Sequence, residues 1–108
     1  MDVGEAGILQ EMVRRIVAAT HPDKIILFGS RARDEAGPHS DYDLLVVAPS
    51  DESEWRRTAD LYWALRDLPA TKDIVWWTAD EIAEWKDVRS HFITTATREG
   101  HVVYERSA

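Results

Sequence analysis

The chain has 108 residues, of which 20 are acidic and 13 are lysine or arginine, and its formal net charge is −7. Its 44% hydrophobic and 31% charged residues are typical of an ordinary globular domain, which excludes a disordered or fibrous protein. The absence of cysteine excludes disulfides, thiolate catalysis and cysteine-ligated zinc. The excess of acidic residues also disfavours direct binding to a nucleic-acid backbone.

No segment has the chemistry of a membrane anchor or of an export signal. Apolar runs stay well below the roughly 20 residues that a membrane-spanning helix requires. Residues 1–6 lack the basic and apolar regions of a signal peptide. We therefore expect a cytoplasmic protein that forms one domain and does not contact a membrane.

The first half of the chain predicts one helix and two strands. Apolar residues recur on one side of a helical wheel from Ile8 to Thr20, and Pro22 ends this helix because the residue before a proline is pushed out of the helical region. The continuous apolar run Lys24–Phe28 predicts a buried strand, and residues 30–40 predict a polar loop. A second strand is expected over Asp41–Ala48.

The second half predicts three helices and two strands, and a capping box marks the start of one helix. Thr78 is expected to cap the first turn of that helix, with Glu81 reaching back, and Ile82, Trp85 and Val88 lie along it. The other elements are a helix over 52–68, a strand over Asp73–Trp77, a short helix over 92–98 that ends at Gly100, and a strand over His101–Tyr104. The order α-β-β-α-β-α-α-β predicts an α/β fold, with helices packed on a small mixed sheet.

The turn after the first strand has the composition of a phosphate-binding loop. Gly29 permits a positive φ and a close approach of a ligand to the backbone. The hydroxyl of Ser30, the neighbouring backbone N–H groups and the guanidinium groups of Arg31 and Arg33 suit a polyphosphate. Arg31 is favoured as the phosphate ligand, whereas Arg33 has the alternative role of a surface ion-pair partner for the acidic residues that follow it. An ordinary strand-to-turn exit is the alternative for the glycine and the serine.

Three aspartates lie at the start of apolar strands, where burial does not require them. Residues two apart on a strand point to the same face, so Asp41 and Asp43 are expected side by side. Two adjacent carboxylates repel each other unless something neutralises them, and a hard divalent cation is the usual partner. Asp73 opens the third strand in the same way. The alternative is a solvated strand end, because Asp-x-Asp alone is frequent by chance.

Together these residues predict a phosphoryl or nucleotidyl transfer that uses two Mg²⁺ ions. Asp41 and Asp43 would bridge both ions. Asp73 would complete the ion on the side of the nucleophile and could accept its proton. One ion would activate the attacking hydroxyl, and the other would neutralise the departing pyrophosphate.

The segment Gly29-Ser30-Arg31-Ala32-Arg33, followed by Ser40-Asp41-Tyr42-Asp43-Leu44, resembles the G-S-x₁₀-D-x-D signature of the DNA polymerase beta-like nucleotidyltransferases. The G-S-R-A-R form and the short chain resemble the minimal nucleotidyltransferase (MNT) group. The resemblance covers the whole chain, so residues 1–108 are expected to form a single minimal nucleotidyltransferase domain. The motif places Ser40 with Gly29, Ser30, Arg31 and Arg33 among the expected nucleotide-binding residues.

The resemblance also implies a reaction and a partner. Proteins of the MNT group are typically encoded beside HEPN-domain proteins, with which they form toxin–antitoxin pairs. The HEPN protein is an RNase toxin, and the MNT protein transfers AMP from ATP to a tyrosine hydroxyl of the toxin. The resemblance therefore implies a Mg²⁺-dependent protein adenylyltransferase that acts as an antitoxin in a hetero-oligomer with its toxin.

Five tryptophans in so short a chain call for an explanation. In the helix over residues 52–68, Trp55, Tyr62 and Trp63 form an aromatic stripe beside a stripe of leucines. The aromatic stripe either wraps around a small core or forms a surface on which the partner docks. A docking surface favours a non-catalytic antitoxin, which acts by binding, as the alternative to the enzyme. Transfer to a small molecule is a third hypothesis, which the short chain disfavours because it leaves little room for an acceptor pocket.

Overall fold

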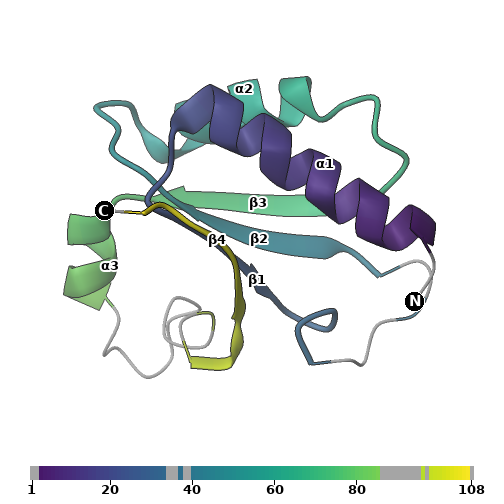
Figure 1. Cartoon of the computed structure of the whole chain (residues 1–108). Helices are drawn as coiled ribbons and strands as arrows, with labels where there is room; N and C mark the ends of the chain where they lie inside the picture. The colour runs from purple at the N-terminus through teal and green to yellow at the C-terminus, as the bar shows by residue number, and fades with distance from the viewer. Residues whose placement is uncertain (1–2, 34–36, 38–39, 86–95, 97, 108) are drawn as a thin grey trace.

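The structure, a computed structural model, describes residues 3–33, 37, 40–85, 96 and 98–107. Figure 1 shows that α1 and α2 cover one face of the sheet, whereas α3 packs on the other side. No helix in these ranges is both long and apolar enough to cross a membrane. The elements are α1 (Val3–Thr20), β1 (Lys24–Phe28), β2 (Tyr42–Val47), α2 (Glu54–Ala64), β3 (Lys72–Trp77), α3 (Ala79–Trp85) and β4 (His101–Glu105).

Among the described residues, one mixed sheet of four strands in the order β3-β2-β1-β4 carries the other elements. β1 is antiparallel to both β2 and β4, whereas β2 and β3 are parallel. A parallel pair needs a crossover connection, and α2 lies in that connection and packs on the sheet. The predicted α/β fold with a small mixed sheet is confirmed.

The central strands are buried on both faces, which explains why they read as continuous apolar runs. Leu44 and Val46 of β2 pack with Met12 of α1 and Leu61 of α2 in the larger core. Leu45, between them, points to the opposite face and belongs to a smaller core beside α3. Because side chains alternate along a strand, this division also decides on which face each aspartate lies.

The first helix is longer than predicted at its N-terminus. α1 begins at Val3 rather than Ile8, because extending an existing helix adds a hydrogen bond for each residue that is fixed, even where the apolar pattern is absent. Its end is confirmed at Thr20. There His21 adopts the left-handed φ of 47°, and its N–H donates to the carbonyl of Val17 over 3.0 Å.

The second helix is shorter than predicted. α2 covers Glu54–Ala64 rather than residues 52–68. Beyond it the N–H of Leu68 donates to the carbonyl of Leu65 over 3.1 Å, which is the spacing of a turn and not of an α-helix. Pro69 disfavours the helical conformation of the residue before it, so the helix cannot continue.

The predicted capping box at the start of α3 is confirmed. The N–H of Thr78 donates to Oε1 of Glu81 over 2.8 Å, and the N–H of Glu81 donates to Oγ1 of Thr78 over 3.2 Å. Arg57 of α2 is buried and donates to both carboxylate oxygens of Glu81, over 2.7 and 3.3 Å. These bonds hold the pKa of Glu81 below its usual value and fix α3 against α2.

The predicted helix over residues 92–98 lies largely outside the described part of the chain, as does Val88. Ala96 and Arg98 are described and are helical. The N–H of Gly100 donates to the carbonyl of Ala96 over 3.0 Å, which fits a helix ending at Gly100. Gly100 does not have a positive φ, so its role as a glycine is set by space rather than by a left-handed turn.

Replacing Gly100 with alanine is expected to destabilise the fold. The added Cβ would overlap the carbonyl oxygen of Ala96 and the side chain of Ile26, so the junction between the last helical turn and β4 must shift. We expect Gly100→Ala to lower the free energy of unfolding by about 1–3 kcal/mol, measured by urea denaturation. Gly7→Ala is the matched control: a Cβ there meets no atom within 4 Å, and alanine should stabilise α1 by about 0.5–1 kcal/mol. Equal effects of the two substitutions would contradict the assigned packing.

Candidate functional site

The pairing of β2 with β3 brings two of the predicted aspartates together. Asp43 of β2 lies directly beside Asp73 of β3 in the parallel register, and beside Phe28 of β1 in the antiparallel register. Asp41 immediately precedes β2 and is two residues from Asp43, close enough that its negative charge raises the pKa of Asp43. The predicted juxtaposition therefore arises at one end of the β2–β3 pair.

The aspartates lie on the face of the sheet that α1 and α2 do not cover. Val75 and Trp77 follow Asp73 at intervals of two residues on β3, and both pack in the smaller core beside α3. Leu45 has the same relation to Asp43 on β2. Because alternate residues share a face, the carboxylates lie on the α3 side.

Electrostatics support a cluster of carboxylates. Burial is the largest cause that raises the pKa of Asp43, and the negative charges of Asp73 and Asp41 raise it further. The positive charge of Arg33 opposes this rise. Asp43 is half-buried, whereas Asp41, Asp73 and Arg33 are exposed, so the site opens to solvent.

Gly29 is required by its contact with Asp43. Its φ is +75°, a conformation that side-chain-bearing residues rarely adopt, and a Cβ at this position would overlap Oδ2 of Asp43. The turn that follows is closed by two hydrogen bonds, from the N–H of Ala32 to the carbonyl of Gly29 (3.1 Å) and from the N–H of Arg33 to the carbonyl of Ser30 (3.2 Å). The phosphate-binding turn that the sequence predicts thus lies directly beside a predicted metal ligand.

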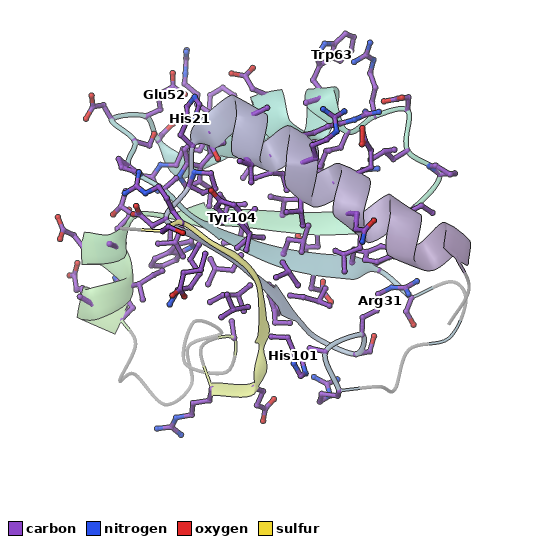
Figure 2. All side chains as sticks on the ribbon, in the orientation of Figure 1. His21, Arg31, Glu52, Trp63, His101 and Tyr104 are labelled. Carbon is purple, nitrogen blue, oxygen red and sulfur yellow. The ribbon has the colours of Figure 1, made fainter. Side chains whose placement is uncertain are left out.

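Arg31 holds together the two ends of the loop between β1 and β2 (Figure 2). Its Nε and Nη2 donate to the carbonyl of Ser40 over 3.1 and 2.9 Å, and its guanidinium lies 3.9 Å from the ring centroid of Tyr42. The hydroxyl of Ser40 accepts the N–H of Gly37 over 2.9 Å. These contacts place Asp41, which follows Ser40, so Arg31 and Ser40 shape the site, and their direct contact with a nucleotide stays a prediction.

His101 makes a contact with the turn after β1 that sequence analysis missed. Its Nε2 lies 2.6 Å from the carbonyl oxygen of Ala32, and because a carbonyl only accepts, Nε2 is the donor (Figure 2). The bond ties the turn after β1 to β4, whose His101 pairs with Leu27 of β1. This contact follows from the pairing register of β1 with β4. That register contains a bulge, so local sequence patterns do not predict it.

The donor set suits a divalent cation, although the carboxylates are not preassembled around one. Within residues 3–33, 37, 40–85, 96 and 98–107, no three acidic or histidine side chains converge into a cation-binding cluster. The fit comes from the chemistry of the donors: Asp43 and Asp73 in register with Asp41 beside them provide carboxylate oxygens, which hard cations prefer. A bound cation would offset the repulsion between these carboxylates.

The three residues of the predicted partner surface have different environments. Trp55 is 70% and Trp63 67% exposed, and Figure 2 shows Trp63 projecting from α2 away from the sheet. The guanidinium of Arg66 lies 3.9 Å from the ring centroid of Trp63. Tyr62 is less exposed, and its hydroxyl accepts the N–H of Ile74 in β3 over 2.8 Å. None of the three joins the carboxylates, because α2 lies on the opposite face of the sheet.

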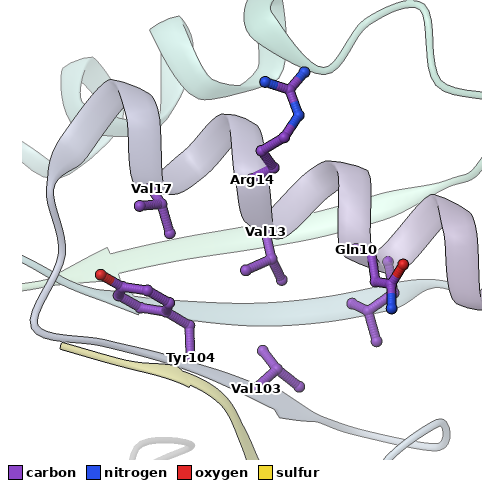
Figure 3. A pocket seen from close by; sticks show the side chains of 7 residues that line it. Gln10, Val13, Arg14, Val17, Val103 and Tyr104 are labelled. Atoms are coloured by element: carbon purple, nitrogen blue, oxygen red, sulfur yellow. The ribbon is translucent and has the colours of Figure 1, made fainter. Parts of the chain in front are cut away.

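A pocket of about 500 Å³ lies between α1 and β4 (Figure 3). Val13 and Val17 of α1 and Val103 and Tyr104 of β4 provide most of its apolar lining. These residues pack against the larger core, so the pocket is on the α1 side of the sheet. It contains none of the predicted site residues.

Comparison with known proteins identifies a matching family profile and a similar fold. The sequence profile of a nucleotidyltransferase domain family matches residues 8–100 of the chain. The structure is similar to the crystal structure of a proposed nucleotidyltransferase from Sulfolobus solfataricus, with a TM-score of 0.63 and 18% identity over 93% of this chain and 79% of that chain. At this identity the similarity shows a shared fold. Among curated proteins, none has significant sequence similarity to this chain.

The raised pKa of Asp43 predicts that its ionisation costs stability. The folded protein binds this proton more tightly than the unfolded chain, so stability falls as the pH rises above the ordinary value of 3.8 and through the raised pKa. Asp43→Asn is therefore expected to raise the unfolding temperature at pH 7 without added divalent cation, and this gain should vanish towards pH 3.

Thermal denaturation between pH 3 and pH 8 measures the effect. Asp60→Asn, an exposed aspartate on α2, controls for the loss of one negative charge. A gain for Asp43→Asn that equals that of Asp60→Asn at every pH would show that burial and the neighbouring carboxylates do not destabilise the Asp43 charge.

Proposed function

This chain belongs to the nucleotidyltransferase domain family, and from this premise we propose that it transfers AMP from ATP to a tyrosine hydroxyl of a HEPN-type RNase toxin, and so acts as its antitoxin. The observation that carries the proposal is the register of Asp43 with Asp73 beside the turn at Gly29. It places a carboxylate pair beside the turn in which the sequence predicts polyphosphate binding, and the motif resemblance supplies the MNT group and its partner.

Asp41, Asp43 and Asp73 would hold the divalent cations, which we propose to be two Mg²⁺ ions. When bound, the cations neutralise the phosphate charges and lower the pKa of the attacking hydroxyl. The raised pKa of Asp43 supports this assignment, because the site without a cation is one in which the carboxylates oppose each other's ionisation. The triphosphate of ATP would lie against Gly29 and Ser30. Arg33 is close enough to Asp43 for its positive charge to lower the pKa of that carboxyl.

In the proposed reaction the tyrosine oxygen attacks the α-phosphorus of ATP. A bond forms between this oxygen and the α-phosphorus, and the bond from the α-phosphorus to the bridging oxygen of pyrophosphate breaks. Asp73 accepts the proton of the hydroxyl, and pyrophosphate leaves with the bonding electron pair. Asp73 suits this role because its side chain is exposed at the edge strand of the sheet, where an acceptor group can reach it.

An exposed site favours a macromolecular acceptor over a small molecule. Asp41 and Asp73 are both exposed, so a side chain of a docked protein can reach them from solvent. The pocket between α1 and β4 lies on the other side of the sheet and offers no acceptor site near the carboxylates. A protein partner would supply the enclosure that the described part of the chain does not provide there.

Asp73→Ala is expected to lower AMP transfer by roughly 100-fold or more, because it removes the proposed proton acceptor and metal ligand. The assay follows label from α-labelled ATP onto the co-expressed toxin, and intact mass gives the shift in whole AMP units. Asp60→Ala, on the opposite face of the sheet, is the matched control and should retain transfer. Undiminished transfer by purified Asp73→Ala would contradict the role of Asp73 as proton acceptor and metal ligand.

A non-catalytic antitoxin remains the second candidate, because Trp55 and Trp63 expose two large apolar side chains on α2. We expect the Asp41→Asn/Asp43→Asn variant to bind the toxin but to fail in neutralising it in cells. A pure binder would neutralise equally well with this double substitution.

The complementary Trp55→Ala/Trp63→Ala variant tests the surface itself. If the partner docks on α2, each substitution removes an anchor worth about 2 kcal/mol or more, and the affinity for the toxin falls strongly. Calorimetry with the purified toxin measures this loss. Wild-type affinity of the tryptophan variant would show that Trp55 and Trp63 are not part of the interface.

A further inference from the structure

The edge of β3 carries a hydrogen bond that lies next to Asp73. In the described part of the chain β3 is an edge strand, so its outward-facing N–H and carbonyl groups have no neighbouring strand there. The N–H of Ile74 nevertheless has a protein partner: it donates to the hydroxyl of Tyr62 on α2 over 2.8 Å. Tyr62 therefore links α2 to the outer edge of the sheet.

This bond acts on the peptide group of Asp73. The N–H of Ile74 and the carbonyl of Asp73 belong to one planar peptide unit, so fixing one fixes the orientation of the other. Ile74 itself is buried and pairs with Leu44, directly after the pair of Asp73 with Asp43. The backbone of Asp73 is thus held on one side by β2 and on the other by Tyr62.

We propose that Tyr62 is the positioning residue for Asp73, and that its hydroxyl keeps Asp73 in register with Asp43 for nucleotidyl transfer. This inference rests on the proposed function and deepens it, because it names what holds the proton acceptor at an exposed strand edge. It also distinguishes Tyr62 from Trp55 and Trp63: the hydroxyl of Tyr62 is committed to the sheet, whereas the two tryptophans project into solvent.

The position of the bond predicts which kinetic constant changes. The triphosphate is proposed to lie at the turn after β1, which Tyr62 does not touch. Asp73 is proposed to act on the acceptor hydroxyl, where a displacement of about 1 Å can cost roughly 100-fold in rate. Tyr62→Phe, which keeps the ring and removes only the hydroxyl, is expected to lower kcat roughly 10- to 100-fold while KM for ATP stays within about twofold.

Tyr104→Phe is the matched control, because it removes the same atom from a tyrosine at the opposite end of the sheet. Tyr104 is in β4 and lines the pocket beside α1, away from the carboxylates. Its kinetic constants should equal those of the wild type. Thermal denaturation of both variants establishes that each is folded at the assay temperature.

Two further measurements do not depend on transfer activity. Amide hydrogen exchange should become faster at Ile74 in Tyr62→Phe and stay unchanged in Tyr104→Phe. Mn²⁺, used as a paramagnetic probe, should broaden the resonances of Asp43 and Asp73 in the wild type. In Tyr62→Phe the broadening at Asp73 should weaken while that at Asp43 remains.

The outcomes separate this inference from the proposed function. If the wild type transfers AMP and Tyr62→Phe keeps its kcat, the positioning role is overturned and the proposed function stands. If the wild type transfers no label but Mn²⁺ broadening at Asp73 depends on the Tyr62 hydroxyl, the proposed function fails and the positioning of Asp73 is supported. Unchanged exchange at Ile74 together with unchanged broadening at Asp73 overturns the positioning role whatever the activity.

Discussion

The parallel pairing of β2 with β3 is the constraint on which the site depends. It places Asp43 beside Asp73, and the apolar residues that follow each aspartate fix the register. A slip of one residue would move Leu45 and its neighbours to the opposite core and would turn the affected carboxylate towards α1 and α2. The same alternation that builds two cores on two faces therefore also presents the carboxylates to solvent on the α3 side. The register that packs the two cores is therefore the same register that places Asp43 beside Asp73.

Around that pair, contacts from distant parts of the chain act on the backbone beside the carboxylates. Gly29 leaves the space that the carboxylate of Asp43 fills, and Arg31 fastens the carbonyl of Ser40, just before Asp41. His101 ties the turn after β1 to the last strand. Arg31 and His101 bond to backbone carbonyls and not to the carboxylate oxygens of the aspartates. The backbone of such a site can be well ordered while its carboxylate oxygens remain available for a cation.

The sequence predicted the features that depend on local patterns. The apolar runs predicted the strands, and Thr78 and Glu81 predicted the capping box. The contacts of His101 and Arg31 were missed because they join residues whose proximity depends on sheet register or on the path of a loop. The extent of α2 was overestimated because the leucine stripe continues through a turn that no longer has helical hydrogen bonds. The different roles of the aromatic residues on α2 could not be predicted either. Helical periodicity groups Tyr62 with Trp63, although only Tyr62 forms a hydrogen bond with the sheet.

The acidity of the chain has different consequences at different places. Glu81 and Glu11 have arginine partners, which lower the pKa of each carboxyl, so their negative charges are compatible with the fold. Asp43 is in the opposite situation, because burial and two neighbouring carboxylates raise its pKa. A residue whose charge is unfavourable in the folded protein is retained at a cost in stability, which is typical of a functional position. A bound cation would favour the ionised form of Asp43 and so offset this cost in stability. The net charge of −7 thus includes carboxylates that arginines compensate and one, Asp43, whose charge is disfavoured by burial and by its acidic neighbours.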